Sequence, residues 1–536
     1  MRGRMMQTPL LISSLIEHAG RVYGTQEIVS RTVEGPIHRY TWLDARNRSI
    51  QLAQALGAHG ITAGDRIGTL GWNTYRHLEL YYGISGMGAV CHTLNPRLHP
   101  TELVYIVNHA EDRILFVDLT FVPLAEAVAD KLPGVERYVV LTDSENMPET
   151  ALSNAIAYED FIAGSDGDYE WPVLDEGDAA ALCYTSGTTG HPKGALYTHR
   201  STVLHAFGVA MPDVFNMRPS TCVLPIVPLF HACSWGIAYS APLAGAKIVF
   251  PGPRYDPEAL TDLMTAESVN YCAGVPSVFI PLVQYWRDHG NKPPSLAMAV
   301  MGGTAPPPSL CAALEEDFGI EFRHAWGMTE MSPLGTVNTL MPEHRALPLE
   351  QRRIFQTKQG RPPFGVEVRI VDDDGNRLPH DGIVFGELQV RGPWVIQSYF
   401  KDDESRLTED GWFPTGDVAT IDSQCYIHIT DRSKDLIKSG GEWISSIDVE
   451  NTAMGHDDIV MAAVIGIPDE RWDERPILIA VAAPDSNPTK ESVLEHLAGT
   501  LAKWQLPDEV YFVDELPMGA TGKVQKTKLR EQYAAE

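Results

Sequence analysis

The sequence has few of the features that mark a secreted or metal-stabilised protein. Its 536 residues include only seven cysteines, and no two of them form a Cys-x-x-Cys pair. An odd number of scattered thiols argues against a disulfide framework or a zinc site, and it indicates reduced, mostly buried side chains in a cytoplasmic protein. The cysteines are Cys91, Cys183, Cys222, Cys233, Cys272, Cys311 and Cys425.

Long hydrophobic runs and an excess of positive charge are also missing. No apolar run reaches the length that a membrane-spanning helix needs. Lys and Arg number 42 against 70 Asp and Glu, a formal net charge of −28. This balance disfavours nucleic acid and anionic membranes as partners, although a small anionic ligand responds to local charge. The first residues are basic and then apolar, but Glu17 and His18 interrupt that stretch and favour an amphipathic helix over a signal peptide.

The order of helical and strand-like segments predicts the fold class. A chain of 536 residues is too long for one core, and its length predicts roughly three or four folding units. A helical pattern over residues 41–60 is followed by strand-like segments at 65–72 and 112–118. Similar alternation recurs further along the chain, and it predicts parallel sheets covered by helices.

The pattern changes near Gly360. Residues 365–379 and 382–392 read as strand, turn and strand, with Asp-Gly-Asn as the turn, and predict an antiparallel β unit from about 345 to 430. A smaller mixed unit follows, with strands at 460–467, 477–484 and 509–515 and a helix at 490–505. We therefore expect an N-terminal domain of residues 1–431, a hinge at 432–435 and a small C-terminal domain of residues 436–536.

A flexible polar stretch, "YTSGTTGHPKG" (Tyr184–Gly194), follows the apolar run "AAALCY". A Ser/Thr/Gly-rich surface linker is one interpretation. The apolar run predicts a buried strand, however, so the stretch lies at the carboxyl edge of a sheet, where α/β folds bind ligands. Its glycines free backbone N–H groups to converge on an anion, and Lys193 adds positive charge, as in a phosphate cradle. The stretch lacks the GxxxxGK[ST] pattern of a Walker A loop, and the strand-like "GALYTH" after it predicts a β-loop-β setting.

This stretch resembles the signature of the adenylate-forming superfamily, which includes acyl-CoA synthetases, the adenylation domains of peptide synthetases, and luciferases. Four further motifs resemble that family in the same order: "HAWGMTE" (324–330), "WFPTGDVATID" (412–422), "DRSKDLIKSGGEWIS" (431–445) and "TGKVQK" (521–526). The resemblance runs from about residue 60 to the end. It implies an α/β fold whose large N-terminal domain has two doubly wound αβ subdomains and a β-barrel-like subdomain, followed by a small mobile α+β domain.

The resemblance assigns the polar loop to the β- and γ-phosphates of ATP, and Thr329 and Glu330 to the α-phosphate. A hydroxyl bonds a phosphate oxygen, and a carboxylate binds Mg²⁺, which prefers oxygen ligands; an ordinary helix start is the alternative for this pair. Asp417 is assigned to the ribose hydroxyls, with a turn residue as the alternative, and Arg432 also reaches the ribose. The other residues assigned to ATP are Thr185, Ser186, Gly187, Thr188, Thr189, Gly190, Lys193, Gly302, Gly303, Thr304, His324, Ala325, Trp326, Gly327, Met328 and Ile429, with Thr185 also assigned to the metal.

Lys523 is assigned the main catalytic role by the same resemblance. An anionic carboxylate has to attack an anionic phosphorus, and a fixed cation offsets the repulsion and stabilises developing charge. The alternative is an ordinary solvated lysine. His231, in "PLFHACSW", is assigned to the border of the acyl pocket, with a structural role as the alternative.

The resemblance also implies two orientations of the small domain. Rotation at Lys434 and Asp435 withdraws Lys523 and presents another face for a thiol-transfer step, in which CoA accepts the acyl group. A plain turn is the alternative for the residues assigned to the CoA channel. Those residues are Lys438, Gly440, Gly441, Glu442 and Trp443.

The residues after Phe230 bear on the acid that is activated. Amino-acid-activating relatives usually carry an Asp soon after this Phe, whereas His231, Ala232 and Cys233 follow it here, so an amino-acid substrate is disfavoured. The candidate pocket is apolar and is expected to accept an uncharged acyl chain. Its substrate-binding residues are assigned as His231, Trp235, Gly302, Gly303, Trp326 and Pro333.

Residues 228–260 look closest to medium- and long-chain acyl-CoA synthetases, and among these to the methylmercaptopropionate–CoA ligases of dimethylsulfoniopropionate breakdown. Met and Trp side chains suit a thioether, so the hypothesised acid is 3-methylmercaptopropionate, with short- and medium-chain fatty acids as analogues. A long-chain ligase, an enzyme loading a carrier protein, a non-catalytic nucleotide-binding relative and a light-emitting oxygenase remain alternatives. The expected partners are a carboxylic acid, ATP, Mg²⁺ and CoA, without nucleic acid or membrane, and a homodimer stays open.

Overall fold

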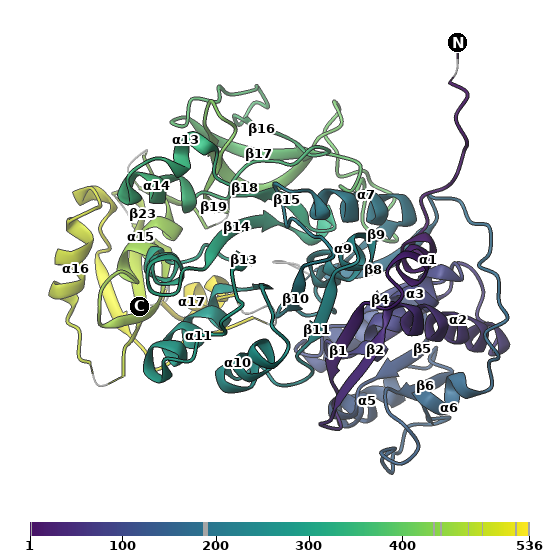
Figure 1. Ribbon diagram of the computed structural model, residues 1–536. Coiled ribbons are helices and arrows are strands. Elements are labelled where there is room, and N and C mark those ends of the chain that lie inside the picture. Colours follow the sequence, from purple (N-terminus) through teal and green to yellow (C-terminus); the bar gives the residue numbers. More distant parts are fainter. Residues whose placement is uncertain are drawn as a thin grey trace.

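The computed structural model describes residues 1, 3–185, 191–432, 435–439, 442–469, 471–484, 486–519 and 523–533. Within these residues four β-sheets organise the chain, and helices separate or cover the two larger ones (Figure 1). The two larger sheets use strands from the first two thirds of the sequence, and two smaller sheets follow. The protein is therefore a mixed α/β protein with a large N-terminal domain and a smaller C-terminal domain, as predicted.

The seven-stranded sheet explains the first helix–strand alternation. In spatial order its strands are β7 (Ile156–Ala157), β6 (Arg137–Val140), β5 (Asp112–Val117), β3 (Arg66–Leu70), β4 (Val90–Thr93), β8 (Ala179–Thr185) and β9 (Lys193–Thr198). Its covering helices are α2 (Trp42–Ala58), α3 (Tyr75–Gly86) and α6 (Tyr158–Ala163) on one face and α4 (Pro100–Ala110) and α5 (Val122–Val128) on the other. Ile114 and Phe116 of β5 face the first set, and Leu115 and Val117 face the second, because successive strand residues point to opposite faces.

The eight-stranded sheet has parallel central strands and one antiparallel strand at each edge. In spatial order its strands are β15 (Leu334–Val337), β14 (Glu321–Gly327), β13 (Met298–Gly302), β12 (Tyr271–Gly274), β10 (Cys222–Pro225), β11 (Lys247–Phe250), β1 (Glu27–Arg31) and β2 (Ile37–Thr41). Its outer helices are α10 (Pro257–Ala266), α11 (Pro276–His289) and α12 (Pro308–Ala312). Its inner helices are α1 (Ile12–Val22), α7 (His199–Ala210) and α9 (Ile237–Ala244), which share one core with α2 and α3. The two large sheets are thus joined through a common helical layer.

The predicted β unit after Gly360 is a four-stranded antiparallel sheet whose strands follow the order of the sequence. They are β16 (Glu367–Val371), β17 (Phe385–Arg391), β18 (Phe413–Ile421) and β19 (Ile427–Arg432). The expected start at about 345 is wrong, because α13 (Pro342–Arg345) and α14 (Leu349–Gln356) occupy the beginning of that range. Prolines at the start of each helix and good helix formers in "LEQRRIFQ" account for this.

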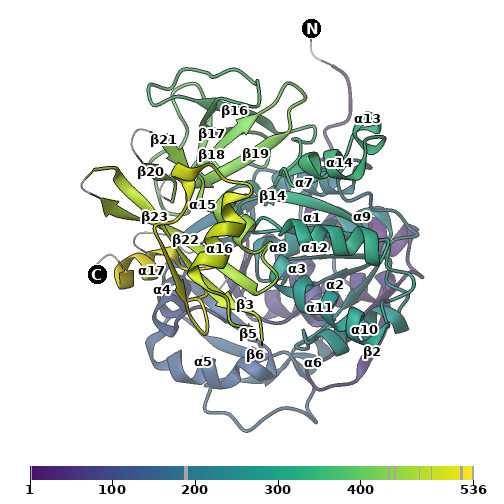
Figure 2. The same ribbon diagram turned by 90° about the vertical axis from the view of Figure 1, so that its left-hand side faces the viewer.

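The last sheet belongs to the small C-terminal domain, which lies beside the large one (Figure 2). Its strands are β20 (Ile437–Ser439), β21 (Glu442–Ile444), β22 (Ile459–Asp469), β23 (Asp473–Ala482) and β24 (Glu509–Phe512), and its helices are α15 (Ser446–Ala453), α16 (Lys490–Ala498) and α17 (Lys526–Tyr533). The predicted helix at 490–505 stops at Ala498, because Gly499 ends it.

Two expectations about the chain as a whole are confirmed. Six cysteines are buried free thiols and only Cys425 is exposed. The first segment forms the amphipathic helix α1, whose apolar side is buried. In the part of the chain that the structure describes, no helix is both long and apolar enough to cross a membrane.

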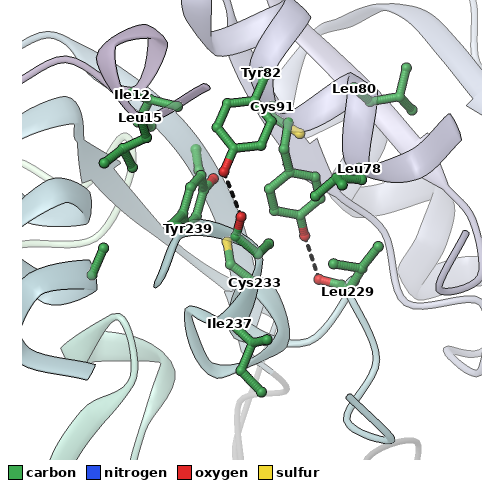
Figure 3. Packing of buried hydrophobic residues seen from close by; sticks show 14 of the residues in the cluster. Ile12, Leu15, Leu78, Leu80, Tyr82, Cys91, Leu229, Cys233, Ile237 and Tyr239 are labelled. Atoms are coloured by element: carbon green, nitrogen blue, oxygen red, sulfur yellow. Dashed lines mark hydrogen bonds between the residues drawn. The ribbon is translucent and has the colours of Figure 1, made fainter. Parts of the chain in front are cut away.

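A buried contact between the helical layer and residues 229–238 positions the segment around His231. Figure 3 shows Tyr82 of α3 pointing to the backbone of this segment, where its hydroxyl donates to the carbonyl of Ala238. Pro242 lies four residues after Ala238 inside α9 and has no N–H to close that helical hydrogen bond. Tyr82 therefore supplies the donor that the helix lacks.

We expect Tyr82→Phe to lower the free energy of unfolding by about 1–3 kcal/mol, because it leaves a buried carbonyl without a partner. Pro242→Ala in the same chain returns an N–H and should recover part of the loss, a non-additivity typical of residues in contact. Urea unfolding of the two single variants and the double variant measures this coupling. Additive effects would show that the hydroxyl and the proline act independently.

Candidate active site

The strands on either side of the polar loop form the predicted β-loop-β unit. β8 and β9 are antiparallel and in register, with Thr185 opposite Lys193. The loop residues Ser186, Gly187, Thr188, Thr189 and Gly190, assigned to ATP, lie outside the described residues. On the incoming side Tyr184 Oη lies 2.6 Å from His109 Nδ1 of α4. The flanks of the loop are therefore attached to the body of the sheet.

Lys193 and Glu330 both contact Tyr399, one through its ring and the other through its hydroxyl. The ammonium nitrogen of Lys193 lies 5.1 Å from the ring centroid of Tyr399, a cation–π contact. Tyr399 donates its hydroxyl hydrogen to Glu330 Oε1 at 2.7 Å. Sequence reasoning missed Tyr399, because the segment "QSYFKD" that contains it carries no motif.

Thr329 and Glu330 belong to a short 3₁₀ turn that follows β14 directly. The carbonyl of Thr329 accepts from Tyr197 Oη, and the carbonyl of Glu330 accepts from the N–H of Ile396 at 2.9 Å. Hydrogen bonds that two other segments donate to the backbone carbonyls of the turn thus fix it in place. The Glu330 side chain is buried.

Two of the assigned glycines are closely packed. A Cβ on Gly302 would lie 2.7 Å from the Ala325 carbonyl oxygen and 3.2 Å from the ring of Trp235. A Cβ on Gly327 would lie 2.0 Å from the Pro333 oxygen. Side chains at these two positions would therefore collide with neighbouring residues. The neighbouring assigned residues Gly303, Thr304, His324 and Met328 lie on the same strands or directly after them.

Asp417 is a buried carboxylate with two partners. Trp326 Nε1 donates to Asp417 Oδ2 at 3.0 Å, and Arg432 Nε lies 3.4 Å from Asp417 Oδ1. Asp417 and Arg432 are also opposite each other in the β18–β19 ladder, and Ile429 lies on the same strand. Burial raises the pKa of Asp417, and the charges of Arg432 and Lys523 oppose that rise.

Lys523 reaches this cluster from the small domain. The turn that carries it is closed by Gly519 N–H donating to the Lys523 carbonyl at 2.7 Å and by Gln525 N–H donating to that of Pro517 at 2.8 Å. Much of the residue is open to solvent, but its ammonium lies among protein charges. Desolvation and repulsion from Arg432 lower the pKa of Lys523 to about 8, against the opposing charges of Asp417 and Glu330.

His231 precedes a left-handed turn. Ala232, Cys233, Ser234 and Trp235 have φ of 41°, 53°, 52° and 53°, and Gly236 continues at 77°. A left-handed conformation costs about 1–2 kcal/mol per non-glycine residue, so the turn stores strain. Ser234 Oγ donates to the Val227 carbonyl at 2.8 Å, and this bond helps to hold the turn in place. Burial and the charges of Lys523 and Arg97 lower the pKa of His231 to about 4, so its imidazole is neutral at physiological pH.

The assigned hinge and channel residues are described only in part. Lys434, Gly440 and Gly441 lie outside the described residues, and of Glu442 only the backbone is described, in β21. Asp435 pairs with Arg530 at 2.7 Å. Lys438 and Trp443 face each other in the β20–β21 ladder, with the Lys438 ammonium 4.5 Å from a Trp443 ring centroid.

The chemistry of the donors is compatible with Mg²⁺ that is held mainly by a nucleotide. Among the described residues, no three His, Cys, Asp or Glu side chains are grouped as a metal site. One carboxylate, that of Glu330, has one oxygen accepting from Tyr399. Mg²⁺ is commonly bound by one or two carboxylates together with substrate phosphates, so a complete protein cage is not required.

Two family models match the chain. One, described as AMP-binding enzyme, matches residues 16–400, and the other, described as AMP-binding enzyme C-terminal domain, matches residues 448–523. The chain belongs to the AMP-binding enzyme family. ATP and CoA are substrates that suit this AMP-binding enzyme. Glu330 lies in the first matched region and Lys523 at the end of the second, whereas Asp417 and Arg432 lie between the two regions.

Known proteins resemble this AMP-binding enzyme over almost its whole length. It is 50% identical to a 3-methylmercaptopropionyl-CoA ligase of Ruegeria lacuscaerulensis over 533 residues, covering 99% of each chain. It is 48% identical to a medium-chain-fatty-acid–CoA ligase of Ectopseudomonas oleovorans, covering 99% of this chain and 98% of the relative. The crystal structure of the anthranilate CoA ligase AuaEII with anthranoyl-AMP superposes with a TM-score of 0.86 at 25% identity, covering 98% of both chains.

We expect Trp326→Phe to weaken ATP binding by about tenfold, because it removes the indole donor that orients the Asp417 carboxylate. Calorimetric titration with ATP in the absence of an acid measures the change. Trp412→Phe is the matched control, since Trp412 stacks against Arg369 and Arg391 at ring distances of 4.5 and 4.6 Å instead. Equal affinities in the two variants would remove Trp326 from the nucleotide site.

Proposed function

We propose that the protein is an ATP-dependent acid–CoA ligase that forms an acyl-adenylate and then an acyl-CoA thioester. The observation that carries this proposal is that Lys523, from the small domain, lies within electrostatic range of the buried carboxylates of Glu330 and Asp417 in the large domain. Membership of the AMP-binding family and relatives that are CoA ligases support it. The reduced thiols support a cytoplasmic location.

In the first step, a carboxylate oxygen of the acid attacks the α-phosphorus of ATP. The new oxygen–phosphorus bond replaces the bond to the β-phosphate oxygen, and pyrophosphate leaves. Lys523 lies between the two anions and offsets their repulsion, while Asp417 and Arg432 hold the ribose. Lys193 holds the leaving phosphates, and Thr329 donates to an α-phosphate oxygen. Glu330 and Thr185 would hold Mg²⁺, which would neutralise charge on the phosphates.

In the second step, the CoA sulfur attacks the acyl carbonyl carbon, and the bond to AMP breaks. The thiol gives up its proton, and AMP leaves with the electron pair of the broken bond. We place the change in domain orientation between the two steps at residues 432–435, where the small domain rotates. The rotation withdraws Lys523 from the site and brings strands β20 and β21, with Lys438 and Trp443, in its place. The neutral imidazole of His231 borders the acyl group in both steps.

The acyl pocket favours a short or medium uncharged chain. Trp235 and Trp326 are bulky, and Gly302 lets the Trp235 ring approach the backbone of β13. The residues His231, Ala232 and Cys233 after Phe230 offer no carboxylate to pair with an amino group. Met331 is buried at the end of the 3₁₀ turn that begins with Thr329. We therefore propose 3-methylmercaptopropionate as the substrate, with short- and medium-chain fatty acids as analogues, in agreement with the names of the similar ligases.

Pyrophosphate release tests this proposal directly. With ATP and Mg²⁺, we expect 3-methylmercaptopropionate and the shorter fatty acids to give turnover that requires CoA, and aryl and amino acids to give little. The panel runs from acetate to palmitate, with and without CoA. Turnover that does not depend on CoA would indicate another acyl acceptor, such as a carrier protein. A large preference for butyrate or octanoate over 3-methylmercaptopropionate would refute the specific substrate.

The role of Lys523 predicts a pH dependence. The Lys523 amine is protonated below its pKa of about 8, and its positive charge is lost as the pH rises through that value. We expect kcat/KM for ATP–pyrophosphate exchange without CoA to fall with an apparent pKa near that value, because kcat/KM reports the free enzyme. Lys523→Arg should lose activity but keep a flat profile in this range, since arginine stays charged. A wild-type profile that stays flat well above the expected pKa would exclude Lys523 as the titrating group.

A further inference from the structure

Hydrogen bonds join residues just before the boundary segment 432–435 to residues that follow it in the small domain. Asp431, near the end of β19, is buried, and its carboxylate accepts from the N–H of Ser446 at 2.7 Å and from that of Arg432 at 2.8 Å. Ser445 Oγ donates to the carbonyl of Thr430. The end of β19 is thus joined to the first residues of α15.

Lys526 adds a charge to this junction. Its ammonium lies 2.7 Å from Glu450 Oε1 and contacts Ser446 Oγ. Burial opposes the charged form of Lys526, but the carboxylates of Glu450, Asp431 and Asp435 outweigh burial and raise its pKa. One ammonium therefore faces carboxylates from both sides of the boundary. We call Thr430, Asp431, Ser445, Ser446 and Lys526 the boundary contact.

The boundary contact and the proposed catalytic lysine are close in sequence. Lys526 is the first residue of α17, and Lys523 lies three residues earlier, in the turn closed by Gly519 and Gln525. Lys526 is fixed against Ser446 and Glu450, and Ser446 is bonded to Asp431, so this arrangement limits where Lys523 can lie. By contrast, the Asp435–Arg530 pair joins the last residue of the hinge to the small domain.

We propose that Asp431 is a positioning residue for adenylation: through Ser446 and Lys526 it holds the small domain in the orientation that delivers Lys523. This inference rests on the proposed function. When the small domain rotates at residues 432–435, Asp431 stays with the large domain while Ser446, Glu450 and Lys526 move together. The boundary contact exists in one orientation only, and its strength sets how the two orientations are populated.

Asp431→Asn tests this role with little change in size. Each carboxylate oxygen of Asp431 accepts one backbone N–H, and an amide has only one acceptor, so one N–H loses its partner in this orientation alone. We expect single-turnover formation of the acyl-adenylate to fall by at least about tenfold, while thioester formation from preformed acyl-adenylate and CoA stays within about twofold. An equal fall in both reactions, or no fall in either, would overturn the proposal.

A second comparison uses two lysines of α17. Lys526→Met should slow adenylation selectively, whereas Lys528→Met, at an exposed position two residues later, should not. Removing Lys526 alone leaves the half-buried Glu450 without its cation, with only the Val464 N–H still donating to it, which destabilises the domain. The variant Lys526→Met/Glu450→Gln removes both charges and should keep the selective loss. A double variant that folds and adenylates at the wild-type rate would contradict the role of Lys526.

The distribution of orientations is measurable without turnover. Cys425 is the exposed cysteine of the large domain, and Glu495→Cys places a second label on the exposed side of α16. Distances between spin labels at these sites should show one main population in the otherwise wild-type chain and a second, enlarged population with Asp431→Asn. An unchanged distribution would overturn the proposal, even if the acid specificity or the ligase activity itself proved different from that proposed above.

Discussion

The positive charge of Lys523 has to be brought from the small domain to buried carboxylates in the large one. Glu330 and Asp417 are held in place by elements of the large domain alone, through Tyr399 and Trp326. Lys523 instead depends on a turn and a helix that follow the last strand of the chain. The reaction proposed here brings two anions together, so the arrangement of the two domains controls the chemistry as directly as any side chain within the pocket.

Much of the fold follows from hydrophobic patterning that needs no tertiary information. Buried strands such as β5 are continuous apolar runs between turn residues, and the alternation of helices and strands defines parallel sheets. The same patterning gave the wrong start for the antiparallel unit, because α13 and α14 are short and polar and their apolar spacing is weak. The shared helical layer between the two large sheets joins segments far apart in sequence, and one-dimensional patterns do not reveal such contacts.

The candidate site residues come from motifs, whereas the contacts that packing adds to them have no sequence signal. Thr329, Glu330, Asp417 and Lys523 stand in recognisable motifs, and the structure brings the last three into one charge cluster. Tyr399 has no motif, although its hydroxyl donates to Glu330 and its ring contacts Lys193. The neutral state of His231 likewise depends on burial and on charges from distant segments, which the local sequence does not encode.

The left-handed turn from Ala232 to Gly236 limits how the acyl pocket can change. Valine, isoleucine or threonine fits poorly at a positive φ, so the first four positions of the turn tolerate few side-chain shapes. Gly302 of β13 is restricted as well, because a Cβ there would lie 2.7 Å from the Ala325 carbonyl oxygen and 3.2 Å from the Trp235 ring. The turn and Gly302 thus act as a fixed template, and directed evolution of the proposed acyl pocket is expected to succeed at other positions of its lining.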